Sequence, residues 1–132
     1  LNQIEDTEVI VYLNRLSDKL MLGNLDATRD WGHSKDYVRA MVMILEQDKP
    51  DDYVCATGVS HSVRELCDYT FSNLDLNYKD YVGVDKKFYR PEELVSLKGD
   101  SSKLRSIGFE VEYTFETMLD EMINYWKDFY EL

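Results

Sequence analysis

The chain has 132 residues, of which 44% are hydrophobic and 13% aromatic, and it contains only six Gly and two Pro. This composition predicts one folded domain over residues 1–132 and excludes a disordered chain. Fifteen Lys and Arg against 26 Asp and Glu give a net charge of -11, which argues against nucleic-acid binding and against an anionic membrane surface. A small anionic ligand stays possible, because a few arginines dominate the field at short range.

The beginning of the chain is predicted to form a helix followed by a strand. Residues 8–17 carry apolar side chains at helical spacing, and residues 19–23 are predicted as a short strand with a turn at Gly23 and Asn24. The apolar positions of this first helix are Val9, Tyr12, Leu13 and Leu16.

The next part of the chain is predicted as a second helix followed by a second strand. Residues 36–47 follow the i, i+3, i+4, i+7, i+8 pattern of an amphipathic helix, and Pro50 closes that segment. Residues 53–57 are rich in β-prone side chains and end at Gly58, which predicts a buried strand.

A capping-box pattern at Ser62 and Glu65 predicts the start of a third helix. Residues 80–85 are predicted as a strand and residues 86–91 as a loop. The third helix is expected to bury one face, which consists of Val63, Leu66, Cys67, Thr70, Phe71 and Leu74.

The last part of the chain is predicted to be helical. Residues 101–107 form a short predicted helix that ends at Gly108, and a long helix follows. Short strands alternating with helices predict an α/β, mostly helical domain without a complete Rossmann sheet. A single stripe of the long helix is expected to be core, namely Phe115, Met118, Leu119, Met122, Ile123, Trp126 and Tyr130.

The sequence contains neither a dinucleotide loop nor a catalytic tyrosine and lysine pair. Phosphate-binding loops need closely spaced glycines, whereas the nearest pairs here, such as Gly23 and Gly32, are nine positions apart. In none of the ten tyrosines does a lysine follow four positions later. We therefore expect no catalytic residue and no cofactor site in this chain.

The histidines and cysteines are expected to be structural. His33, Asp36 and His61 could approach one another, but they lack the spacing of known metal motifs, so we expect no metal site. Cys55 and Cys67 fall on core positions and are expected to be buried thiols in a reducing compartment. Together with the lack of a signal-peptide or membrane-span pattern, this predicts a cytoplasmic protein.

Two loops carry arginines, at residues 29–33 and 89–93. One interpretation is that Arg29 and Arg90 are surface residues paired with local carboxylates, as most arginines of an acidic protein are. The other is that their planar guanidinium groups converge on a diphosphate. Spacing alone does not decide between these interpretations.

Residues 22–38, with the sequence LGNLDATRDWGHSKDYV, closely resemble a stretch of the GDP-mannose 4,6-dehydratases, members of the extended short-chain dehydrogenase/reductase superfamily. The resemblance covers residues 19–125, while residues 1–18 match only as a helical pattern. It continues in residues 48–54, 56–58, 61–65, 88–91 and 93 and is weaker in residues 99–103 and the final helix.

The resemblance implies a nucleotide-sugar-binding portion of such an enzyme. In that family a separate Rossmann domain carries NADP and the catalytic Thr, Glu, Tyr and Lys. Arg29 and Arg90 would contact the diphosphate of a GDP-sugar, and Glu93 would accept hydrogen bonds from the ribose hydroxyls. Asn24 and Trp31 would shape the loops.

The leading hypothesis is a GDP-sugar-binding fragment of an NADP-dependent GDP-mannose 4,6-dehydratase, a lyase that makes GDP-4-keto-6-deoxymannose, with no turnover by this chain alone. The alternative is a non-catalytic binding or assembly module that kept the fold and lost the ligand. It is motivated by Glu92, whose charge lies beside Arg90, and by the lack of a basic segment in residues 1–18. Partners would be GDP-mannose or a related GDP-sugar, and either a second copy or a separate Rossmann-domain chain.

Overall fold

The computed structural model describes residues 19–89 and 96–131, in which short strands alternate with helices. The predicted α/β, mostly helical class without a complete Rossmann sheet is confirmed. The helix predicted over residues 8–17 lies outside the described residues. The elements are β1 (Leu20–Leu22), β2 (Thr28–Arg29), α2 (Ser34–Leu45), β3 (His61–Ser62), α3 (Val63–Ser72), α4 (Tyr78–Tyr81), β4 (Val82–Val84), the 3-10 helix η1 (Lys86–Phe88), β5 (Ser96–Leu97), α5 (Ser102–Ser106) and α6 (Phe115–Tyr130).

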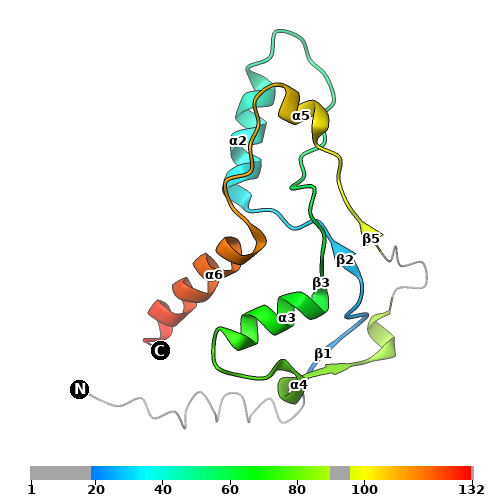
Figure 1. The fold of residues 1–132 in the computed structure, drawn as a ribbon, viewed down its shortest axis with the longest axis vertical. Helices are drawn as coiled ribbons and strands as arrows, with labels where there is room; N and C mark the ends of the chain where they lie inside the picture. The colour runs from blue at the N-terminus through cyan, green and yellow to red at the C-terminus, as the bar shows by residue number, and fades with distance from the viewer. Residues whose placement is uncertain (1–18, 90–95, 132) are drawn as a thin grey trace.

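The strands form two small sheets. In one, β1 pairs in parallel with β4, so that Leu20 lies opposite Val82. In the other, β2 lies between β3, which is antiparallel to it, and β5, which is parallel. Helices α2 and α5 lie at one end of the molecule and α3, α4 and β1 at the other, with β2, β3 and β5 between them (Figure 1).

Local capping explains where the three longer helices begin. Ser62 and Glu65 form the predicted capping box at the start of α3. Helix α2 begins two residues before the predicted position, because the His33 side chain accepts a hydrogen bond from the Lys35 amide. Thr114 caps α6 in a corresponding way.

The strand predicted over residues 53–57 is wrong, because this segment is extended but pairs with no strand among the described residues. The amides of Thr57 and Gly58 instead donate to the carboxylate of Asp30, 2.9 and 2.8 Å away. Tyr53 and Cys55 pack against the core between α2 and α5, and Cys55 is half-buried rather than buried. The end of this β-prone segment is thus fixed by hydrogen bonds to the Asp30 side chain and not by pairing in a sheet.

The apolar stripe of α6 is only partly core. Phe115, Leu119 and Ile123 are buried against α3 and the loop after β2, as predicted. The prediction is wrong for the later positions: Met122 and Tyr130 are more than half exposed, at 54% and 56%. The helix continues beyond the elements that could cover it in the described part of the chain.

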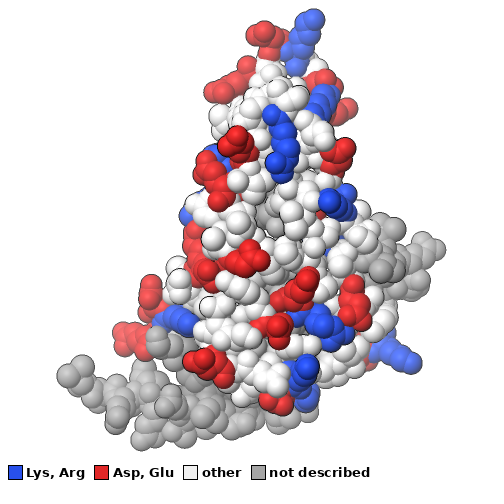
Figure 2. Space-filling view, viewed as in Figure 1, with Lys and Arg blue, Asp and Glu red and all other residues white. Residues whose placement is uncertain are grey.

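The surface agrees with the acidic composition. On the face shown in Figure 2, Lys and Arg side chains are scattered among Asp and Glu side chains and do not form one basic patch. None of the described helices is both long enough and apolar enough to cross a bilayer.

Candidate functional site

Arg29 lies in the middle strand of the three-stranded sheet. It pairs in register with His61 on β3 and with Leu97 on β5, and it is half-buried. One guanidinium nitrogen, Nη1, donates to the carbonyl of Thr28 at 2.7 Å. Arg29, which was predicted to lie in a loop, therefore lies on a strand, and strand pairing restricts its backbone more than a loop would.

A hollow of about 310 Å³ lies beside Arg29. Its lining includes two cationic residues, Arg29 and Lys98, and one tyrosine, Tyr37. Cations and a phenolic donor around one hollow suit an anionic, hydrogen-bonding ligand such as a phosphate ester. The lining residues are Arg29, Asp30, Tyr37, Val54, Cys55, Ala56, Leu97, Lys98 and Gly99.

Asp30 holds together the backbone segments around the hollow. Its carboxylate accepts from the Thr57 hydroxyl at 2.6 Å and from the amides of Thr57, Gly58 and Gly99. Burial by itself would raise the pKa of Asp30, but the hydrogen bonds from Thr57, Gly58 and Gly99 outweigh it and lower the pKa below its ordinary value. Asp30 is therefore a charged brace at neutral pH.

The phenol of Tyr37 packs directly on Gly32. A Cβ at position 32 would lie less than 3.0 Å from three atoms of the phenol, so only glycine permits this contact. Burial, followed by the negative charge of Asp30, raises the pKa of Tyr37. Tyr37 thus stays protonated and able to donate a hydrogen bond.

Cys55 lines the hollow as a half-buried free cysteine. Burial, followed by the charges of Asp36 and Asp30, raises the pKa of its thiol. Because the thiolate is the reactive form, this supports the expectation that Cys55 is not a nucleophile.

An aromatic stack fixes the loop after Arg29. The rings of Trp31 and His61 both stack on Phe115, at the start of α6, with centroid distances of 5.8 and 4.0 Å. Trp31 thereby links the loop to α6, in agreement with its expected role in shaping that loop. Asn24 has a similar local role, since its side chain accepts from the Asp26 amide and closes the turn before β2.

The structure places one of the three predicted binding residues. Arg29 lines the hollow, whereas Arg90 and Glu93 lie outside the described residues. Strand β5 begins directly after that segment, at Ser96, which lies opposite Thr28. The chain therefore returns to the side of β2, next to Arg29, three positions after Glu93.

Three further residues of the hollow were not predicted from the sequence. Tyr37 falls within the helix pattern predicted over residues 36–47, where it reads as an apolar position, and Asp30 has no predicted role of its own. Lys98 lies between the individual stretches that match the family. The only available signal was that Asp30 and Tyr37 fall within the long matching stretch of residues 22–38.

The histidines take part in aromatic stacking. His33 stacks on Tyr113 at 4.1 Å, and its Nε2 lies 3.5 Å from a carboxylate oxygen of Glu121. Within residues 19–89 and 96–131 no three His, Cys, Asp or Glu side chains are grouped so that they could hold a metal ion.

Comparison with known sequences identifies one family. The family model described as GDP-mannose 4,6 dehydratase matches residues 6–122. GDP-mannose 4,6 dehydratase 1 of Arabidopsis thaliana is 47% identical over 110 residues, which are 83% of this chain and 30% of that protein. GDP-mannose 4,6 dehydratase of Homo sapiens is 38% identical over 132 aligned residues, covering 86% of this chain and 35% of that protein. The chain thus spans about a third of the length of these relatives.

Comparison with solved structures identifies proteins that share this fold. The structure of RMD from Pseudomonas aeruginosa complexed with NADPH has a TM-score of 0.73 at 20% identity, covering 95% of this chain and 44% of that one. The dTDP-glucose 4,6-dehydratase of Bacillus anthracis in complex with NAD has a TM-score of 0.75 at 19% identity, covering 93% and 39%.

Proposed function

Because the chain belongs to the GDP-mannose 4,6-dehydratase family, we propose that it forms the part of such an enzyme that binds the GDP-sugar. In this proposal the hollow beside Arg29 receives the diphosphate of GDP-mannose or a related GDP-sugar. The observation that supports it most directly is the position of Arg29. This residue lies on β2, which is paired with β3, and within the residues that match the family model. It lines the hollow together with a second cationic residue, Lys98.

The chemistry of the hollow supports an anionic ligand despite the overall charge of -11. The planar guanidinium of Arg29 can donate two parallel hydrogen bonds to phosphate oxygens, and the ammonium group of Lys98 adds a point charge. Tyr37 can donate from its protonated phenol. Arg90 and Glu93 complete the proposal as a second diphosphate contact and as the acceptor for the ribose hydroxyls.

The residues of this chain do not fit the nicotinamide cofactor that the fold family implies. The two parallel strand pairs in the described part are short, and no closely spaced glycines open a helix directly after a strand. We therefore assign NADP binding and hydride transfer to protein outside these 132 residues, and the proposed contribution of this chain is to bind and orient the sugar nucleotide.

We place the protein in the cytoplasm. Cys55 and Cys67 are free thiols, as expected in a reducing compartment. A Rossmann-domain partner is the proposed source of the cofactor site.

Replacing Arg29 by alanine is expected to weaken GDP-mannose binding by about 10-fold to 100-fold, because a charge-assisted hydrogen bond contributes about 1.5–3 kcal/mol. Isothermal calorimetry with GDP and GDP-mannose measures the change. Arg29→Lys keeps the positive charge but loses the paired N–H donors of the guanidinium group. Its affinity for GDP-mannose should therefore lie between those of the unaltered chain and Arg29→Ala.

Arg64→Ala is the matched control. It removes the same charge, but Arg64 bonds to Asp26 and Tyr78 and does not line the hollow. An equal loss of affinity in both variants would argue for a general charge effect. No binding by the unaltered chain would instead support a module that has lost its ligand.

A further inference from the structure

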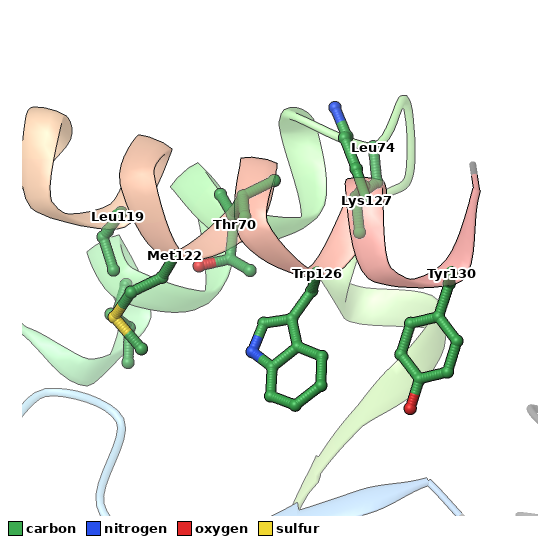
Figure 3. A pocket seen from close by; sticks show the side chains of 9 residues that line it. Thr70, Leu74, Leu119, Met122, Trp126, Lys127 and Tyr130 are labelled. Atoms are coloured by element: carbon green, nitrogen blue, oxygen red, sulfur yellow. The ribbon is translucent and has the colours of Figure 1, made fainter.

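An apolar groove between α3 and α6 contrasts with the hollow beside Arg29. The groove has a volume of about 390 Å³, and Met122, Trp126 and Tyr130 project into it from the same side of α6 (Figure 3). Lys127 is the charged residue of its lining, and the ammonium group is already hydrogen-bonded to a backbone carbonyl. An almost wholly apolar lining does not suit a diphosphate, so the hollow beside Arg29 is the better place for an anion.

The hollow beside Arg29 has a negative charge in its wall. Asp30 lines it together with Arg29 and Lys98. By Coulomb's law the carboxylate of Asp30 repels a phosphate group and offsets part of the attraction of the two cations. An aspartate in this position therefore opposes anion binding unless it contributes in another way.

The contribution of Asp30 is to link segments that are remote in sequence. One carboxylate oxygen, Oδ1, accepts from the amide and the hydroxyl of Thr57 at 2.9 and 2.6 Å. The other, Oδ2, accepts from the amides of Gly58 at 2.8 Å and Gly99 at 3.4 Å. Thr57 and Gly99 are 27 and 69 positions along the chain from Asp30. One side chain thus fastens two separate segments to the end of β2.

The segments that Asp30 fastens form part of the wall of the hollow. Residues 54–56 and 97–99 line it, and among the described residues no strand pairing joins them. A Cβ at Gly99 would lie 2.2 Å from the Cβ of Ala56, so glycine permits their close approach. Ser60 adds one link, from its hydroxyl to a carbonyl of β5 at 3.2 Å. The width of the hollow therefore depends mainly on the acceptor that both segments share.

We propose that Asp30 is a positioning residue for the anion, and that the hollow binds a diphosphate less tightly without this carboxylate. Asp30 holds the two segments at the separation at which Arg29 and Lys98 reach the same ligand, and this gain exceeds the repulsion by its charge. The inference rests on the proposed function, because it takes the hollow to be the diphosphate site.

Asp30 keeps its charge throughout the neutral range. Burial raises its pKa, but the hydrogen bonds from Thr57, Gly58 and Gly99 outweigh burial and lower the pKa. Because the pKa is lowered in the folded chain, these hydrogen bonds are complete above the ordinary pKa of an aspartate and are lost only as pH falls through the lowered value. Neutralising Asp30 near pH 7 therefore requires a substitution.

The sign of one affinity change tests the proposal. Asp30→Asn keeps the shape of the side chain but removes the charge and one of the two acceptor oxygens. By charge alone the binding of GDP would tighten, whereas the positioning role predicts about 10-fold weaker binding in isothermal calorimetry. A purely structural role would lower the melting temperature and leave the affinity of the folded chains unchanged or tighter.

Asp100→Asn is the matched control. Asp100 directly follows Gly99, is exposed and does not line the hollow. The substitution removes the same charge and leaves an acceptor for the amide of Ser102, which now bonds to the Asp100 carboxylate at 2.9 Å. Its affinity for GDP should equal that of the unaltered chain or be slightly higher.

Thr57→Val takes the place of Asp30→Asn if circular dichroism shows that the latter is unfolded. Thr57 donates to Asp30 but does not line the hollow. Thr57→Val leaves every charge in place and removes one donor to the Asp30 carboxylate. The positioning role predicts about 3-fold to 10-fold weaker binding of GDP, and unchanged binding would refute it.

The outcomes separate this inference from the proposed function. If the unaltered chain binds GDP and folded Asp30→Asn binds it equally or more tightly, the positioning role is overturned and the proposed function stands. An equal loss of affinity in Asp30→Asn and Asp100→Asn would also overturn the positioning role. If the unaltered chain does not bind GDP, the proposed function fails and the inference fails with it.

Discussion

Replacing Phe115 by alanine is expected to lower the free energy of unfolding by about 3–5 kcal/mol, the usual cost of deleting a buried aromatic ring. Phe115 is 8% exposed and packs between the rings of Trp31 and His61. The variant therefore leaves a cavity and removes two ring contacts at once. Because Trp31 follows Arg29 by two positions, we also expect weaker GDP-mannose binding.

Phe129→Ala is the control for this prediction. Phe129 lies on the same helix but is 63% exposed, so the same substitution should change the free energy of unfolding by less than about 0.5 kcal/mol. Urea unfolding followed by circular dichroism gives both values. Similar values for the two variants would show that the stack around Phe115 does not anchor α6.

Replacing Asp36 by alanine is expected to lower the free energy of unfolding by about 3 kcal/mol, because it leaves buried donors without an acceptor. Asp36 is 1% exposed, and its carboxylate accepts from the amides of Glu112 and Tyr113 and from Arg39. These contacts tie α2 to the segment that leads into α6. Their loss should free the carboxyl-terminal helix as well as α2.

Asp68→Ala removes the same charge from an exposed position on α3 and should be close to neutral. Hydrogen exchange adds a local readout, since the amides of Glu112 and Tyr113 should lose protection in Asp36→Ala. Protection equal to that of the unaltered chain would contradict the proposed tie between α2 and α6.

Local sequence signals were sufficient for α3, α5 and α6, but not for α4 (Tyr78–Tyr81), which overlaps the strand predicted over residues 80–85. The box at Ser62 and Glu65, the stop at Gly108 and the long stripe beginning at Phe115 each act within a few residues, and the structure has helices at all three places. Gly108 has a φ of +100°, which explains why a glycine ends α5.

Contacts between distant segments were not predictable in the same way. The extended segment at residues 53–57 has the composition of a strand, but its partner is the Asp30 side chain, 27 residues away from Thr57. The α6 stripe has one uniform period, although only part of it meets α3. Periodicity predicts which face is apolar, but it does not predict what covers that face.

The candidate site was only partly predictable, and mainly through the family resemblance. Arg29 followed from the match of residues 22–38, and the structure gives it a strand and a hollow. Lys98 reaches the same hollow because β5 pairs in parallel with β2, a non-local pairing that no local pattern indicates. The packing of the Tyr37 phenol against Gly32 was likewise not predictable, because this contact forms only when the chain is folded.

The central claim, that this chain binds a GDP-sugar beside Arg29, is tested most directly by titrating GDP-mannose into the ¹⁵N-labelled chain and recording amide resonances. We expect saturable shifts at the residues that line the hollow, including Arg29, Asp30, Tyr37 and Gly99, and unchanged resonances at Tyr125 and Phe129 on the exposed end of α6. No shifts at millimolar ligand, or shifts confined to α6, would contradict the account.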